Sequence, residues 1–146
     1  MKTIDPDLLM SALAEALETM AFVTINPEFD LTGCVTLLRV SLAFSGVIAG
    51  QLTLCAPRAL GSVIAANLTA VDVESVTPEN AADALRELAN ITAGLLLRQV
   101  CSPQEMPQLA IPIVSSTPAA VGPHSYCLAA LSAEGHPVTI AFRTHA

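Results

Sequence analysis

Hydrophobic and polar residues alternate with two different periods along this chain, and each period predicts a different kind of element. Apolar residues recur every three or four positions, as in an amphipathic helix, in three segments: 6–23, 58–68 and 78–100. Every-second-residue alternation or short apolar runs, which are typical of strands, occur in five segments: 35–44, 47–55, 108–117, 124–132 and 138–143. The predicted order of elements is therefore α-β-β-α-α-β-β-β.

The residues at the segment boundaries support this division. Asp5 and Thr77 each precede a proline at the first position of a predicted helix, which is a favourable arrangement for an N-cap. Ser45-Gly46 and residues 134–137 are turn sequences between pairs of strands. Pro112 lies inside segment 108–117, so we expect that strand at an edge of the sheet or at a bulge.

Most neighbouring strands in this order are joined as hairpins, which favours the α+β class. We expect a mostly antiparallel sheet with helices packed on it. The 146 residues predict one domain that spans 1–146 and contains a hydrophobic core. Gly50, inside a predicted strand, indicates a bulge or a close approach of another backbone. Edge strands of such a sheet need protection, and pairing of two copies through an edge provides it, so we expect a homodimer.

The composition restricts the partners that this chain is expected to bind. It is 53% hydrophobic and 13% charged, which predicts that another subunit covers some of its apolar surface. The formal net charge is −7 and no basic cluster is present, so binding to nucleic acid or to an anionic membrane is not expected. The first segment is amphipathic with early acidic residues, unlike a signal peptide, which favours a cytoplasmic location.

The apolar stretch 31–56 raises the question of a membrane span. Arg39, near its middle, would cost about 2.5–3.5 kcal/mol at the centre of a bilayer. Ser45-Gly46 also divides the stretch into two pieces of strand length. We interpret it as a buried hairpin.

Cysteine and histidine do not indicate a metal site. The four cysteines, at 34, 55, 101 and 127, lie in or beside apolar segments and form no CxxC motif or short Cys/His pairing. Small buried thiols in a reducing compartment are the expected state. The histidines at 124, 136 and 145 are scattered, and we assign no chemistry to them.

The longest predicted helix carries a polar stripe. Asp83, Glu87, Asn90 and Gly94 follow one another at spacings of four, three and four residues, which aligns them along one face. Asn is a weak helix former and Gly costs about 1 kcal/mol relative to Ala inside a helix. The stripe is therefore either a solvated helix face or a contact surface that carries a carboxylate and a carboxamide. The same spacing places Leu97 among these polar residues.

The stripe resembles the signature of the CheC/CheX/FliY family of bacterial chemotaxis phosphatases. That signature is an acidic or serine residue, then Glu-x-x-Asn, then a glycine four residues later, here Asp83, Glu87, Asn90 and Gly94. The single copy of the signature, the length and the element order make the chain most similar to the CheX branch. Segment 17–22 is similar to the end of the family's first helix. The resemblance implies a CheC/CheX-like fold.

The resemblance also implies a function. The chain would be a protein phosphatase for the aspartyl phosphate of a CheY-type response regulator in chemotaxis signalling. Asn90 would position the attacking water in the partner's active site, and Glu87 would pair with the partner's active-site lysine. Asp83, Arg86 and Gly94 would contribute to partner binding. No cofactor is expected in this chain, because the divalent metal belongs to the partner's active site.

Three other interpretations compete with this one. A non-catalytic dimeric module could bind a receiver domain without hydrolysis, although the intact Glu87/Asn90 pair favours activity. A structural domain of a larger flagellar or signalling assembly is another. A hydrolase with its own nucleophile is disfavoured, because no GxSxG motif occurs and no Cys or Ser pairs with a His at a recognisable spacing.

Overall fold

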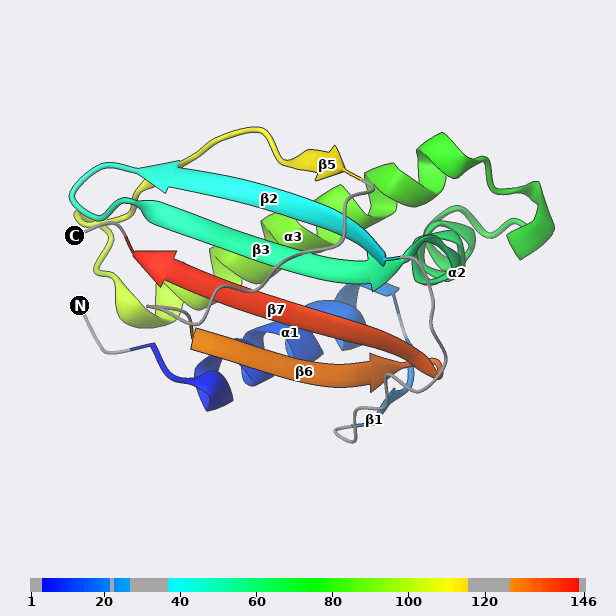
Figure 1. Cartoon of the computed structure of the whole chain (residues 1–146), viewed down its shortest axis with the longest axis horizontal. Coiled ribbons are helices and arrows are strands. Elements are labelled where there is room, and N and C mark those ends of the chain that lie inside the picture. Colours follow the sequence, from blue (N-terminus) through cyan, green and yellow to red (C-terminus); the bar gives the residue numbers. More distant parts are fainter. Residues whose placement is uncertain (1–3, 22, 27–36, 116–126, 145–146) are drawn as a thin grey trace.

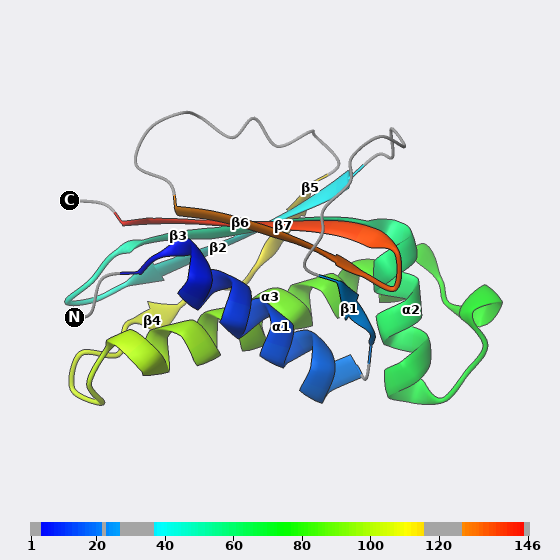
Figure 2. The same ribbon diagram turned by 90° about the horizontal axis from the view of Figure 1, so that it is seen from below.

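In the described part of the chain, a seven-stranded antiparallel sheet and three α-helices form two layers, and these helices lie on one face of the sheet (Figures 1 and 2). The computed structural model describes residues 4–21, 23–26, 37–115 and 127–144. The helices are α1 (Pro6–Ala21), α2 (Arg58–Thr69) and α3 (Pro78–Val100), and a short 3-10 helix, η1 (Val73–Ser75), connects the last two. The α+β class and the antiparallel sheet predicted from the hairpins are confirmed.

The strands are β1 (Ile25–Asn26), β2 (Leu37–Ser45), β3 (Gly50–Pro57), β4 (Gln108–Leu109), β5 (Ile113–Ser115), β6 (Cys127–Ala133) and β7 (His136–Thr144). Their order in the sheet is β1-β6-β7-β3-β2-β4, and β5 also pairs with β2. β2 and β3 form a hairpin whose register runs from Leu37 opposite Pro57 to Phe44 opposite Gly50. The prediction of a hairpin in 31–56 is thus confirmed from residue 37 onward, and none of the described helices is long and apolar enough to cross a membrane.

Local sequence signals account for the helix starts. The Asp5 carboxylate accepts a hydrogen bond from the Leu8 N–H at 2.8 Å, at the start of α1. The Thr77 hydroxyl accepts one from the Asn80 N–H at 3.1 Å, and Pro78 occupies the first turn of α3. Both predicted caps are confirmed, and the cap at Thr77 sets the first residue of the helix that carries the polar stripe.

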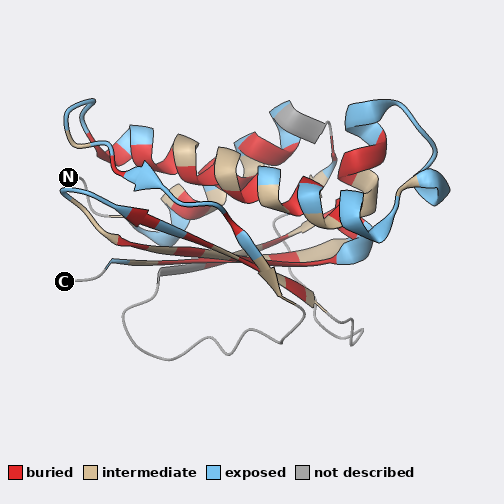
Figure 3. Cartoon of the chain, turned by 90° about the horizontal axis from the view of Figure 1, so that it is seen from above, coloured by how far each residue is buried: buried red, intermediate tan, exposed pale blue. Residues whose placement is uncertain are grey.

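The core lies between the sheet and the helices, where the buried residues of both layers face one another (Figure 3). Leu38, Val40, Leu42 and Phe44 alternate along β2 toward the helices and are buried. The placement of Leu97 on the outer face of α3 was wrong, because this side chain is only 1% exposed. The reason is that α3 packs against α1, α2 and the sheet, so its buried arc is wider than one face.

Proline divides the segment predicted as one strand at 108–117. The structure has two short strands there, β4 and β5, with Pro112 between them, and both pair with β2. Proline has no N–H to donate to a sheet ladder, which explains the interruption. The predicted edge position is confirmed. The two-residue strand β1, which pairs with β6, was not predicted.

Several smaller predictions have definite outcomes. Cys55 and Cys101 are buried free thiols, as expected, whereas Cys34 and the side chain of Cys127 lie outside the described residues. His136 is half-buried, and the other two histidines are outside the described part.

Gly50 does meet a neighbouring backbone closely, because a Cβ there would lie 2.1 Å from the Arg143 carbonyl oxygen.

Candidate functional site

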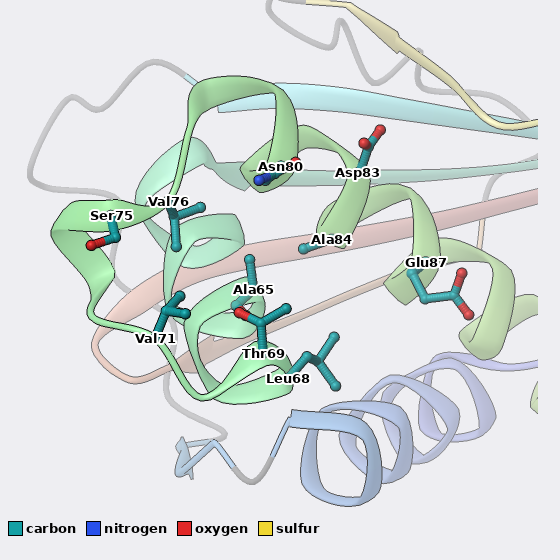
Figure 4. Close-up of a pocket in the computed structure, with 10 residues that line it drawn as sticks. All are labelled: Ala65, Leu68, Thr69, Val71, Ser75, Val76, Asn80, Asp83, Ala84 and Glu87. Atoms are coloured by element: carbon teal, nitrogen blue, oxygen red, sulfur yellow. The ribbon is translucent and has the colours of Figure 1, made fainter.

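The predicted stripe lies along one side of α3. Asp83 and Glu87 are exposed, and Asn90 and Gly94 are half-buried. Figure 4 places Asp83 and Glu87 on successive turns of α3, beside the end of α2. The structure therefore aligns all four residues on one unbroken helix, because Thr77 caps its start and no proline interrupts residues 79–100.

Arg86 forms an ion pair with one residue of the stripe, Asp83. Its guanidinium donates a hydrogen bond to the Asp83 carboxylate three residues earlier, and the two groups form an exposed ion pair. Pairs of this kind are worth about 0.2–1 kcal/mol. Asp83 can therefore exchange Arg86 for a cationic group of another molecule at small cost.

Glu87 and Asn90 differ from Asp83 in their bonding. Among the described residues, neither the Glu87 carboxylate nor the Asn90 carboxamide makes a hydrogen bond or an ion pair with the chain. The carboxylate only accepts hydrogen bonds, whereas the carboxamide has both an acceptor oxygen and a donor NH₂. Residues three positions apart lie side by side on a helix. Together they offer one negative charge and one non-titrating group that can hold a water molecule.

Gly94 leaves open space at the end of the stripe. Among the described residues, a Cβ added there would meet only the Arg98 guanidinium, at an ordinary distance of 3.6 Å. At Gly61, by contrast, a Cβ would lie 2.3 Å from the Ala81 carbonyl oxygen, so α2 and α3 could not keep their spacing. The described packing of the chain explains the glycine at 61 but does not require one at 94.

A hollow of about 510 Å³ adjoins the stripe, between α2 and α3. Its residues are Ala65, Leu68, Thr69, Val71, Ser75, Val76, Asn80, Asp83, Ala84 and Glu87 (Figure 4). The apolar side chains gather at its centre, and the two carboxyl groups stand at its α3 rim. Leu68, the last residue of the apolar spacing in segment 58–68, is 48% exposed at this hollow, so that spacing alone does not indicate the hollow.

No group of three His, Cys, Asp or Glu side chains that could hold a metal ion occurs within the described ranges. The exposed carboxylates Asp83 and Glu87 are the acidic members of the stripe, and Asp83 is already paired with Arg86.

Comparison with known proteins agrees with the fold. A family profile described as "Chemotaxis phosphatase CheX" matches residues 39–126, which is more than half of the chain. The chain therefore belongs to the CheX family. No curated protein sequence matches it.

Solved structures show the same fold at low sequence identity. Chemotaxis protein CheX from Vibrio vulnificus superimposes with a TM-score of 0.75 at 17% identity, over 95% of each chain. A chain of the CheX–CheY–BeF₃–Mg²⁺ complex from Borrelia burgdorferi gives 0.72 at 15% identity, over 99% of this chain and 100% of that one. FliY from Thermotoga maritima gives 0.58 at 15% identity, over 93% and 86%.

Proposed function

We propose that this chain is a cytoplasmic protein phosphatase that hydrolyses the aspartyl phosphate of a CheY-type response regulator in chemotaxis signalling. The observation that carries the proposal is the pair Glu87 and Asn90, without partners among the described residues and one helical turn apart on α3. Membership in the CheX family supports the reaction. The Borrelia burgdorferi structure named above as a CheX–CheY complex supports the partner.

The reaction requires few catalytic groups from this chain. An aspartyl phosphate is a mixed anhydride, and hydrolysis breaks its P–O bond to the carboxyl group while a P–O bond to water forms. The products are inorganic phosphate and the free aspartate, and the water's protons pass to the phosphate and the solvent. Such a displacement accelerates when the water is held in line with the bond that breaks.

Asn90 suits this positioning role. Its carboxamide oxygen accepts a hydrogen bond from the attacking water and its NH₂ can donate to a phosphoryl oxygen, without any change of protonation state. Glu87 supplies a negative charge one turn earlier, which pairs with a cationic side chain of the regulator and fixes how the two proteins meet. Gly94 allows the partner's backbone to approach the helix. The divalent metal expected for the reaction belongs to the regulator, and no step here is assigned to it.

We further propose that the protein works as a homodimer that pairs through the β4–β5 edge. This edge exposes apolar side chains next to a short, interrupted strand, with Ile111 85% and Ile113 68% exposed. Short strands and an edge proline limit open-ended strand pairing, so the proposed contact rests on these exposed apolar side chains. Apolar side chains at that position gain from burial against the same surface of a second copy.

The test is the rate of phosphate loss from a phosphorylated CheY-type regulator, with wild type beside Asn90→Ala, Glu87→Ala and Gln99→Ala. Gln99 is an exposed residue of α3 outside the stripe and serves as the control. We expect the regulator to lose its phosphate faster in the presence of wild type or of Gln99→Ala than it does alone. We expect Asn90→Ala to lose about 100-fold in kcat, the scale of a misplaced reacting group.

Two outcomes would contradict the proposal. If Asn90→Ala is as active as wild type, the carboxamide does not position the water. If wild type binds the beryllofluoride-activated regulator but does not accelerate dephosphorylation, the chain is a binding module. A loss confined to Glu87→Ala would restrict the role of the stripe to docking.

A further inference from the structure

The hollow between α2 and α3 is apolar and open, although it lies beside a charged surface. Leu68 is 48% exposed and Val71 is 47% exposed, and Val73, on the adjoining η1, is 45% exposed. Side chains of Ala65, Leu68, Val71, Val76 and Ala84 point into the same space (Figure 4). Grouped apolar side chains that remain in contact with water are typical of an interaction site.

Small side chains create the hollow. α2 and α3 touch at Gly61, where a Cβ would collide with the Ala81 carbonyl oxygen. One turn further along α2 the walls are Ala65 on one side and Ala84 on the other, and neither side chain is large enough to fill the gap. The chain then leaves α2 through Ala70, whose φ of 55° is left-handed, and returns to α3 through η1. This path carries Val71 and Val76 to the open end of the hollow.

The segment that contributes most of the lining of the hollow, residues 72–87, carries mostly negative charges. Residues 72–87 contain five carboxylates and one cation, Arg86, and all five carboxylates are exposed: Asp72, Glu74, Glu79, Asp83 and Glu87. Such a rim repels nucleic acid and anionic lipid. It attracts a protein surface that presents an apolar side chain between lysines or arginines.

The hollow is continuous with the proposed docking stripe. Asp83 and Glu87 belong to both. The part of the stripe from Asp83 to Asn90 is about 10 Å long, at a rise of 1.5 Å per residue. A stable protein–protein interface covers about 800 Å² on each partner, far more than four residues of one helix face. A regulator that places its phosphorylated aspartate at Asn90 therefore also covers surface beyond the stripe, and the hollow borders it directly.

We propose that the hollow between α2 and α3 is the second half of the docking surface and that it receives an apolar side chain, flanked by basic residues, of the same response regulator. This inference rests on the proposed function. The stripe supplies Glu87 and Asn90 for orientation and chemistry, whereas the hollow supplies affinity. Burial of apolar surface at the interface is the source of that affinity, and the acidic rim selects the partner.

The test uses the intact protein and the CheY-type receiver domain activated with beryllofluoride. Leu68→Ser/Val71→Ser removes two half-exposed apolar side chains, so the fold is expected to tolerate it. Val73→Lys is a second variant that adds a positive charge to the acidic rim at an exposed position. Val47→Ser, in the exposed β2–β3 turn, is the matched control. Dissociation constants, KM and kcat are measured for each, with a thermal melt to confirm folding.

We expect the double variant and Val73→Lys to raise the dissociation constant and KM about tenfold each, with kcat close to wild type. Val47→Ser should match wild type throughout. Asn90→Ala should behave in the opposite way, with a lower kcat and an unchanged dissociation constant. The wild-type dissociation constant should also rise with salt, because the acidic rim is solvent-exposed.

The outcomes separate the two proposals. If wild type is an active phosphatase and the hollow variants bind as tightly as wild type, the docking role of the hollow is overturned and the phosphatase proposal stands. If the hollow variants bind more weakly but wild type shows no hydrolysis, the hollow is supported and the catalytic proposal fails. If wild type binds none of the activated receivers of its host, both are overturned.

Discussion

The Asp83 carboxylate accepts a hydrogen bond from the Arg86 guanidinium, three residues further along the same helix. Because of this ion pair, the two acidic residues of the stripe differ in whether their carboxylate is paired with a cation. Asp83 is already matched with a positive charge, whereas Glu87 has no partner among the described residues. For the proposed docking, we therefore expect Glu87 to make the main electrostatic contact with the regulator and Asp83 a smaller one.

The first prediction concerns this ion pair. Arg86→Gln removes the one cation among residues 72–87 and leaves Asp83 free, so the surface becomes more negative. We expect KM for the phosphorylated regulator to fall by about threefold at low salt, with kcat unchanged, because exposed ion pairs are worth at most about 1 kcal/mol and added charge mainly raises the association rate. The difference should vanish at high salt. A rise in KM would instead give Arg86 a direct contact with the partner, which Arg86→Lys should then partly preserve.

The second prediction compares two glycines. Gly94→Ala is expected to stabilise the protein by up to about 1 kcal/mol, since alanine is the better helix former and its Cβ meets nothing closer than 3.6 Å. The same variant should lose phosphatase activity, because the methyl group stands where the partner's backbone approaches. Chemical denaturation and the dephosphorylation rate measure the two effects separately.

Gly61→Ala provides the contrast. Its Cβ would be 2.3 Å from the Ala81 carbonyl oxygen, so we expect a clear loss of stability as α2 and α3 are forced apart. If Gly94→Ala proves more stable than wild type and equally active, the glycine has no role in partner approach.

The third prediction concerns the sheet edge. Ile113→Lys places a charge on β5, where a second copy is proposed to pair, and should convert the dimer to a monomer in size-exclusion chromatography with light scattering. Glu15→Lys on α1, which packs on β6 and β7 away from that edge, changes charge without touching it and should remain dimeric. A monomeric wild type, or a dimeric Ile113→Lys variant, would show that this edge is not the subunit contact.

The fourth prediction concerns pH. Burial raises the pKa of the Cys55 thiol, against smaller lowering effects of a hydrogen bond with Thr139 and the charge of Arg39. Below the ordinary thiol pKa both the folded and the unfolded thiol are neutral, so stability is unaffected. Above it the unfolded chain ionises first, and the free energy of unfolding falls until the pH passes the folded pKa.

Urea denaturation at pH 7 and pH 10 measures this loss. Cys55→Ala should lose less stability between the two values than wild type does, because it has no thiol to ionise at that position. Cys101, whose pKa is also raised by burial and by the charge of Glu105, remains in both proteins and cancels in the comparison. An identical loss in both proteins would mean that Cys55 ionises equally in the folded and unfolded states.

Much of the fold was predictable because its signals are local. The Thr77–Pro78 cap and the apolar spacing gave the long helix its bounds, and the structure has it at Pro78–Val100. Alternation along β2 identified the residues that face the core. Pro112 indicated an edge position because proline lacks an N–H, although the division into two strands emerged only in the structure.

The errors occurred where packing from several directions decides the outcome. Leu97 was placed with the polar residues of α3 but is buried, because α1, α2 and the sheet all contact that helix. Leu68 ends the apolar spacing of segment 58–68 but is half-exposed, because it lines the open hollow between α2 and α3. Neither outcome depends on the neighbours of these residues in sequence.

The sequence by itself determined the element types, the helix caps and the alignment of Asp83, Glu87, Asn90 and Gly94, since all of these follow from spacing along a single segment. Only the tertiary structure decided that Gly94 faces open space, that α2 and α3 enclose a hollow beside Glu87, and that the β4–β5 edge exposes its isoleucines. These features depend on distances between segments far apart in the chain. Side-chain volumes on both facing elements set those distances, so they cannot be derived from the periodicity of a single segment.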